Sequence, residues 1–138
     1  MQRKEHAMNI FICLDDDNGM MFNNRRQSRD SKVVEDIIKT VGENTLFIDG
    51  YSENLFKDFC NVTVTDDLFR DGFVFVENRD IEEFCDRISV LTVYRWNRKY
   101  PNDFALSFDI SDKGFTLSDT SEFEGTSHEK ITKEVWVK

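Results

Sequence analysis

The sequence predicts an α/β fold, built on a mixed, mostly parallel sheet with flanking helices and a C-terminal antiparallel hairpin. In the first half of the chain, short apolar segments alternate with helical patterns, which favours parallel pairing of the strands. From residue 88 onward, strand-like segments follow one another without a helix between them, so we expect antiparallel pairs there. The length of 138 residues is that of one ordinary domain.

The first strand and the first helix have the clearest patterns. Residues 8–14 read MNIFICL, an apolar and β-branched run that ends in a turn-rich Asp-Asp-Asp-Asn-Gly segment. A helix is predicted from Val33 to Val41, because apolar side chains recur there at the spacing of one helical face. Asp30 can cap the start of this helix and Gly42 can end it.

The remaining elements are shorter. Helical turns are predicted over residues 52–59 and 80–85. We expect the other strands at residues 45–48, 61–65, 72–76, 88–96, 104–108, 114–118 and 131–137.

Charge and hydropathy exclude several classes of partner. Acidic residues outnumber basic ones by 27 to 18, for a net charge of −9, so we expect no nucleic-acid partner. No apolar run approaches the roughly 18 residues of a membrane helix, and no signal-peptide core follows the charged N-terminus. We therefore expect a cytoplasmic protein with no membrane partner, in which residues 1–7 are a disordered lead and residues 8–138 form a single domain. No pattern indicates an oligomeric state.

The sequence indicates no metal site. Cys13, Cys60 and Cys85 have no spacing that suits a zinc site or a redox motif, and we expect Cys13 and Cys60 to be buried as small apolar side chains. A dinuclear zinc hydrolase of the ribonuclease Z type needs several histidines. This chain has only His6 and His128.

The order of the elements, with the residues in their loops, resembles the dihydrofolate reductases. Residues 8–20 (MNIFICLDDDNGM) are similar to the first strand and active-site loop of that family. Residues 44–56 (NTLFIDGYSENLF) are similar to its second strand and the helix after it, and residues 100–104 (YPNDF) to a later turn. The resemblance spans Met8 to the C-terminus. It implies the dihydrofolate reductase-like fold and a cleft that takes a small molecule, with NADPH as the possible cofactor.

Three features depart from the family's pattern. The resemblance implies an acidic residue on the first helix, but an ungapped alignment places Val33 there, with Asp30 nearly one turn earlier. Asp49 and Gly50 stand where the family has a Gly-Arg pair facing a cofactor phosphate, which a carboxylate would repel. The family's glycine-rich turn, which holds the nicotinamide cofactor, is expected to be deleted, because Cys85 leads almost directly into the next strand. The cofactor therefore stays unassigned.

The resemblance implies a ligand cleft between residues 17–22, the first helix and the strand that begins at residue 88. The candidate pocket residues are Met20, Phe22, Asp30, Val33 and Thr92. We assign no catalytic residue.

A basic segment precedes the first helix. Arg25, Arg26 and Arg29 could bind an anion, since guanidinium groups suit bidentate contact, or they could be solvated and pair with surface carboxylates. Trp96 could stack on a ligand or cover a sheet edge.

Three functions remain open. The leading hypothesis is a small-molecule binding or regulatory protein without reductase activity. The second is a divergent NADPH-dependent pteridine- or flavin-type reductase that uses Asp30 as its acid. The third is an anion- or nucleotide-responsive module built around the three arginines.

Overall fold

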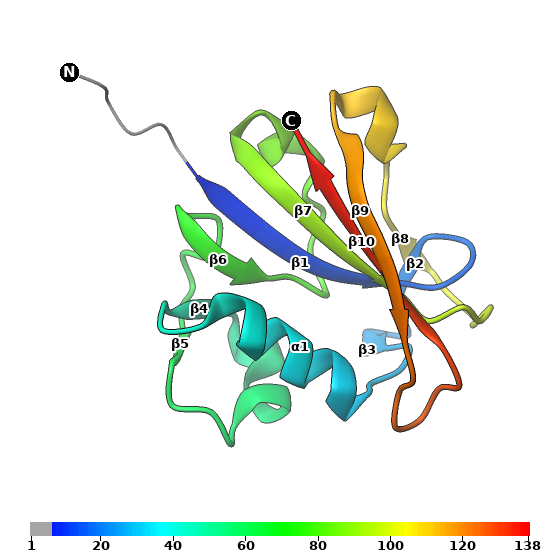
Figure 1. The fold of residues 1–138 in the computed structure, drawn as a ribbon, viewed down its shortest axis with the longest axis horizontal. Coiled ribbons are helices and arrows are strands. Elements are labelled where there is room, and N and C mark those ends of the chain that lie inside the picture. The colour runs from blue at the N-terminus through cyan, green and yellow to red at the C-terminus, as the bar shows by residue number, and fades with distance from the viewer. Residues whose placement is uncertain (1–6) are drawn as a thin grey trace.

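The main sheet has seven strands, in the order β5–β4–β6–β1–β7–β10–β9 (Figure 1). The structure, a computed structural model, describes residues 7–138. The strand bounds are β1 (Met8–Leu14), β4 (Leu46–Ile48), β5 (Val62–Val64), β6 (Gly72–Phe75), β7 (Ile88–Arg95), β9 (Thr116–Phe123) and β10 (Ile131–Val137). The first five strands in this order pair parallel, whereas β10 pairs antiparallel with both β7 and β9. The predicted mixed, mostly parallel sheet with a C-terminal antiparallel hairpin is confirmed.

The structure also has a second, three-stranded sheet in the order β3–β2–β8, which the sequence did not predict. Its strands are β2 (Gly19–Phe22), β3 (Arg25–Arg26) and β8 (Phe104–Ala105), of which only β8 lies in a predicted strand. Asn23 and Asn24 join β2 to β3, with φ of 52° and 60°. Two successive residues in the left-handed region form a tight hairpin turn, and asparagine tolerates that region better than most residues. Two strands this short carry no recognisable apolar alternation.

The helix α1 (Ser31–Val41) lies between the two caps that the sequence predicts, and it begins two residues before Val33. Asp30 is its N-cap and accepts a hydrogen bond from the Lys32 N–H. Gly42 follows its last residue with φ of 64°, and its N–H donates to the Ile38 carbonyl. The other helical segments are short 3-10 turns: η1 (Gly50–Phe56), η2 (Glu82–Arg87) and η3 (Ile110–Lys113).

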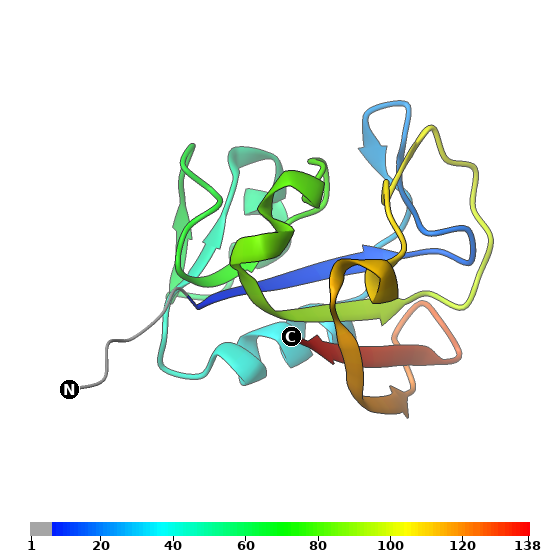
Figure 2. The ribbon, with the colours of Figure 1, turned by 90° about the horizontal axis from the view of Figure 1, so that it is seen from above.

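Hydrophobic side chains fill both faces of the main sheet. Figure 2 shows α1 on one side of β1 and η2 on the other. Side chains alternate along each strand, so Ile10 and Ile12 pack with η2 and η3, whereas Phe11 packs with α1. The α1 side also contains Tyr94 and Trp96, at 0% and 4% exposure.

Two expectations about single residues are wrong. Cys60 is exposed, because the apolar run ends at Phe59 and a turn begins there. Trp96 covers no sheet edge: it follows β7, which lies between β1 and β10 in the interior of the sheet. Cys13 is half-buried and Cys85 is buried.

Other expectations concern the whole chain. Apart from Ala7, the predicted disordered lead lies outside the described residues, and the single domain over residues 8–138 stays a prediction. Among the described residues, no helix has the length and apolar character needed to span a membrane.

Candidate functional site

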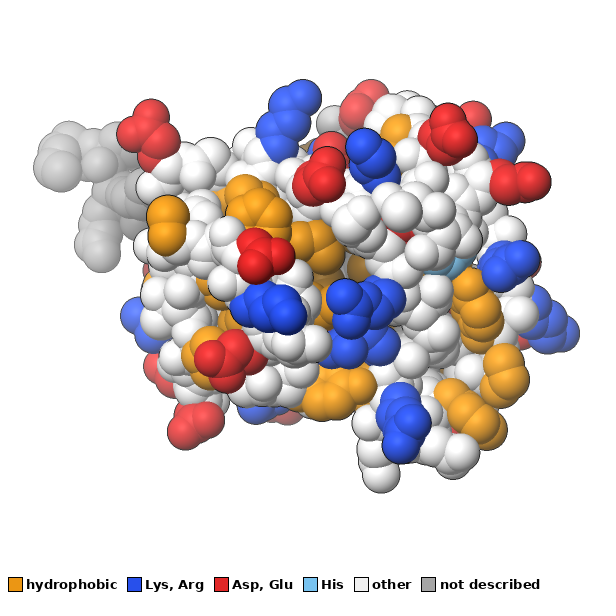
Figure 3. Space-filling view, turned by 90° about the horizontal axis from the view of Figure 1, so that it is seen from below, with side chains coloured by type: hydrophobic (Ala, Val, Ile, Leu, Met, Phe, Trp, Pro, Cys, Tyr) orange, Lys and Arg blue, Asp and Glu red, His pale blue; other side chains and the backbone are white. Residues whose placement is uncertain are grey.

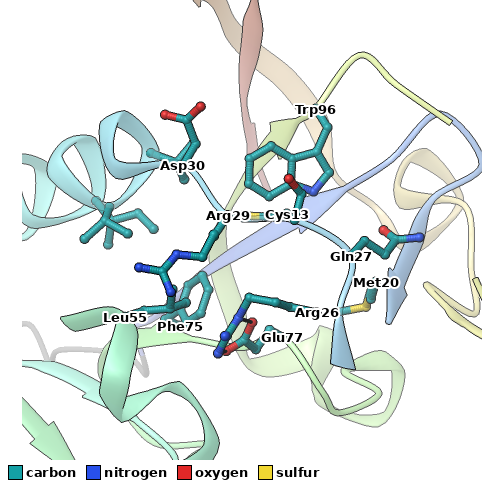
Figure 4. A pocket seen from close by; sticks show the side chains of 14 residues that line it. Cys13, Met20, Arg26, Gln27, Arg29, Asp30, Leu55, Phe75, Glu77 and Trp96 are labelled. Carbon is teal, nitrogen blue, oxygen red and sulfur yellow. Dashed lines mark hydrogen bonds and ion pairs between the residues drawn. The ribbon is translucent and has the colours of Figure 1, made fainter. Parts of the chain in front are cut away.

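An inner cavity lies between the N-terminal half of α1, β1, β6 and the segment after β3 (Figure 4). Its volume is about 20 Å³, which is room for a single water molecule. It adjoins a wider groove of about 380 Å³ between α1 and η1, and the two share Arg29, Asp30, Val34 and Leu55. Figure 3 shows hydrophobic side chains in a hollow near the centre of one face, with Lys and Arg side chains beside it.

The structure brings three of the five predicted pocket residues together. Met20, Asp30 and Val33 line the inner cavity. Phe22 is 40% exposed and lines a separate cavity on the β2–β3 hairpin. Thr92 is buried within the sheet, on the central strand β7, and does not line the inner cavity.

Asp30 accepts hydrogen bonds at every position its carboxylate offers. Its side chain is 0% exposed. Oδ1 accepts from the backbone N–H of Lys32 at 3.0 Å and of Thr126 at 2.8 Å. Oδ2 accepts from the Ser127 N–H at 2.8 Å and contacts His128 Nδ1 at 2.9 Å. The carboxylate therefore joins the start of α1 to the loop between β9 and β10.

These contacts set the protonation state of Asp30. Burial raises the pKa of its carboxyl, but the hydrogen bonds from Thr126, His128, Ser127 and Lys32 outweigh burial and lower it to about 2, from an ordinary value of 3.8. At neutral pH this group is an ionised acceptor and has no proton to donate.

His128 lies in a tight polar and aromatic setting that sequence reasoning missed. Its Nε2 is 3.0 Å from the Tyr100 hydroxyl and 3.1 Å from Ser28 Oγ. Its ring stacks on Trp96, with centroids 4.6 Å apart and planes at 19°. His128 is 98 residues from Asp30, so no local spacing could have linked the two.

Arg26 is neutralised by a buried carboxylate. Its Nε and Nη2 donate to Glu77 Oε1 and Oε2 at 2.9 and 3.0 Å, and Ser52 Oγ donates to the same carboxylate at 2.6 Å. The hydrogen bond to Glu77 raises the pKa of Arg26. Its guanidinium also lies 4.8 Å from the centre of the Tyr51 ring. Arg26 is therefore not available to an external anion.

The three arginines of the basic segment do not share one cavity: Arg26 and Arg29 line the inner cavity, and Arg25 does not. Arg25 lines the separate cavity that contains Phe22. Arg29 lines both the inner cavity and the groove, and Figure 4 shows it reaching across the cavity toward Leu55 and Phe75. Within residues 7–138 it forms no ion pair. Of the three, Arg29 is the cation that a ligand in the cleft could meet.

Other chemistry is limited at this site. Burial raises the pKa of the Cys13 thiol, so this cavity-lining group stays protonated. The described residues contain no group of three or more histidine, cysteine or acidic side chains that could hold a metal ion.

Comparison with known proteins concerns the fold. No family model matches the chain, and no curated protein sequence matches it significantly. Among solved structures, a dihydrofolate reductase from Enterococcus faecalis, complexed with NADP(H) and RAB-propyl, aligns with a TM-score of 0.67 over 95% of both chains. The chain has the dihydrofolate reductase fold. At 9% sequence identity, the likeness describes the path of the backbone and leaves the chemistry open.

The structure shows the surroundings of two of the expected departures from the dihydrofolate reductase pattern. Asp49 is the N-cap of η1, accepts from the Tyr51 N–H at 2.9 Å and pairs with Arg79 at 3.3 Å. Its carboxylate is therefore already paired within the chain. A strand-to-helix turn is also present between β6 and η2, so it has not been deleted as expected, but residues 77–81 contain no glycine. This turn begins with the buried Glu77.

Replacing Asp30 with asparagine should change how stability depends on pH. The folded-state pKa of Asp30 is depressed, so its contribution is present above pH 4 and is lost as pH falls toward 2. The stability difference between wild type and Asp30→Asn should shrink by roughly 1 kcal/mol from pH 6 to pH 3. Urea unfolding at both pH values measures this difference. A difference that stays constant with pH would contradict the role assigned to Asp30.

Gly125 should tolerate no side chain, because a Cβ there would overlap Asp30 Oδ2 and lie 3.0 Å from the His128 carbonyl oxygen. Gly125→Ala should therefore lower the free energy of unfolding by about 2 kcal/mol. Gly50→Ala is the control, since nothing lies within 4 Å of its added Cβ. Its stability should change by less than about 0.5 kcal/mol. Equal effects of the two substitutions in urea unfolding would show that Gly125 is not constrained.

Proposed function

We propose that this protein binds a small organic anion in the groove between α1 and η1 and carries out no hydride transfer. The observation that carries the proposal is Arg29, a cation without an ion-pair partner in residues 7–138, placed across an apolar cavity. A guanidinium beside an apolar wall suits a carboxylate attached to a flat hydrophobic group.

The walls of the cleft support a ligand of this kind. Val33, Leu55 and Phe75 supply apolar surface around the inner cavity. Gln27 Oε1 is buried there without a hydrogen-bond partner among the described residues. A buried acceptor left unpaired is costly, and an N–H or O–H group of a ligand would satisfy it. The inner cavity has room for one water molecule, so a ligand in the groove would reach Gln27 Oε1 with a single N–H or O–H group or through a water, and would place its carboxylate near Arg29.

The outer groove has mixed charge. Lys57 lines it as a second cation, and Glu35 and Asp58 line it as anions. Affinity for an anion would therefore depend on the local contact with Arg29 and not on the net charge of the groove. The ligand's outer part should be neutral or polar.

The reductase alternative is weaker because it needs a proton from Asp30. That carboxyl has a pKa of about 2 and already accepts four hydrogen bonds. Asp49, which stands where the resemblance implies a phosphate contact, is the N-cap of η1 and pairs with Arg79, and residues 77–81 contain no glycine.

The anion-responsive alternative reduces to the same site. Arg26 is held by Glu77, and Arg25 faces another cavity. Arg29 is left as the contact for an anion, so a separate module built on three arginines has no support.

In this proposal the protein acts in the cytoplasm on a small molecule. Its three thiols, Cys13, Cys60 and Cys85, are unpaired, which is usual in reducing compartments. A net charge of −9 supports the absence of a nucleic-acid partner.

Thermal unfolding with and without added ligand tests the proposal. The probes are folate, 4-aminobenzoyl-glutamate, flavin mononucleotide and NADPH, each at millimolar concentration. A probe present at a hundred times its dissociation constant stabilises the fold by about 2.7 kcal/mol. We expect at least one aromatic carboxylate to raise the unfolding temperature of the wild type. Arg29→Ala should lose most of that shift, and Arg25→Ala, the matched control outside the cleft, should keep it.

A shift that survives Arg29→Ala, or the absence of any shift with every carboxylate probe, would overturn the binding proposal. The second half of the proposal is tested by absorbance at 340 nm. NADPH mixed with dihydrofolate and the protein should be consumed no faster than in a blank. Turnover at rates ordinary for enzymes would establish a reductase instead.

A further inference from the structure

A serine, a histidine and an aspartate lie in series beside the inner cavity. Ser28 Oγ is 3.1 Å from His128 Nε2, and His128 Nδ1 is 2.9 Å from Asp30 Oδ2. Ser28 and Asp30 precede α1, whereas His128 comes from the loop between β9 and β10. Binding of an anion at Arg29 makes no use of this series.

Asp30 determines which nitrogen of His128 carries the proton. An ionised carboxylate only accepts hydrogen bonds, so a neutral imidazole at 2.9 Å must donate through Nδ1–H. The lone pair is then on Nε2, which faces the hydroxyls of Ser28 and Tyr100. A histidine held in this tautomer is a general base for a hydroxyl group.

The histidine and the aspartate are held in place before any substrate arrives. Their side chains are 2% and 0% exposed. Trp96 stacks on the imidazole, and Tyr100 meets its edge with planes at 81°. Backbone N–H groups of Thr126 and Ser127 anchor the carboxylate. Groups fixed in this way need little reorganisation during a reaction.

Ser28 lies between this buried pair and the wider groove. It is half-buried and lines the inner cavity, which has room for one water molecule, together with Arg29, which also lines the groove of about 380 Å³. A substrate would approach Ser28 from the groove, where a carbonyl oxygen that gains negative charge would meet the Arg29 guanidinium. Cys13 lines the same cavity, but burial raises the pKa of its thiol and leaves it unreactive.

Tyr100 competes with Ser28 for the same nitrogen. Its hydroxyl is 3.0 Å from His128 Nε2 and 3.4 Å from Ser28 Oγ. When Tyr100 donates to Ser28 Oγ, the serine proton is free to engage Nε2. When Tyr100 donates to Nε2, the serine is displaced. Removing the Tyr100 hydroxyl therefore distinguishes the two possibilities: a reactive serine should keep or gain reactivity, because Nε2 is then left to Ser28.

We propose that Ser28 is a nucleophile, with His128 as its general base and Asp30 as the positioning residue, and that this site hydrolyses small carboxylic esters. Ser28 Oγ bonds to the ester carbonyl carbon while its proton moves to His128 Nε2. The carbonyl carbon's bond to the alcohol oxygen breaks, and the alcohol leaves with that proton. Water, giving a proton to His128, attacks the acyl-serine; the Ser28 oxygen regains that proton as the carboxylic acid departs.

A fluorophosphonate probe and 4-nitrophenyl acetate test this proposal on the purified full chain. Peptide mass spectrometry should find the phosphonyl group on the peptide that contains Ser28. Ester hydrolysis should fall by roughly 100-fold or more in Ser28→Ala. Ser118→Ala is the control: this serine is exposed on the edge strand β9 and lines neither the inner cavity nor the groove. The control should react like the wild type, and Tyr100→Phe should react as fast or faster.

The roles of His128 and Asp30 are tested by the labelling rate of Ser28 per folded molecule. His128→Gln and Asp30→Asn should slow labelling by roughly tenfold or more, at temperatures where circular dichroism shows them folded. A purely structural role would change their unfolding temperature and leave that rate unaltered. The proposal is wrong if folded wild type takes no label at Ser28 and hydrolyses the ester no faster than Ser28→Ala. That outcome would leave the Arg29 binding proposal untouched.

Discussion

The buried carboxylate of Asp30 is the interaction on which the rest of this site depends. It caps α1 through Lys32 and holds the β9–β10 loop through two further backbone N–H groups and His128. The loop follows the edge strand β9, and the helix packs on the centre of the sheet. The Asp30 side chain therefore connects the helix at the centre of the sheet to the loop at its edge. Because all four acceptor positions are occupied, Asp30 acts as a fixed anion. This anion sets the tautomer of His128, which in turn contacts Ser28. It also leaves no room for a side chain at Gly125.

In this dihydrofolate reductase-like fold, several polar groups near the cleft bind one another. Arg26, Glu77 and Ser52 form one closed group, and Asp49 with Arg79 forms another. Within each group the charged side chains are already paired. The cavity that remains is narrow and largely apolar, and Arg29 lines it. The proposal of a small anionic ligand rests on this arrangement.

Local chemistry in the sequence predicted local structure well. Asp30 and Gly42 were enough to place both ends of α1, and the apolar runs located the strands of the main sheet except β9, which was expected at residues 114–118 and extends to Phe123 through exposed polar residues. The sequence could not show that the Asp30 cap also holds residues 96 to 98 positions away. The same limit explains why His128 was considered only as a metal ligand.

Other errors have equally specific causes. Trp96 reads as an edge residue until β10 is known to pair on the outer side of β7. The β2–β3 hairpin turns at Asn23 and Asn24, both in the left-handed region, and its strands of four and two residues are too short to show an alternating pattern. The expected loss of a glycine-rich turn came from looking after η2, whereas the strand-to-helix turn precedes it and begins with Glu77. Strand order, which pattern alone does not determine, decided the case of Trp96.

The ionisation of Asp30 can be measured directly. Carbon-13 NMR of the side-chain carboxyl, followed from pH 7 downward, reports the protonation of this one group. A midpoint near 2, with the signal unchanged through the neutral range, is the expected result. A midpoint between pH 5 and 7 would mean that Asp30 carries an exchangeable proton under physiological conditions, and the fixed-anion description of this site would then be incorrect.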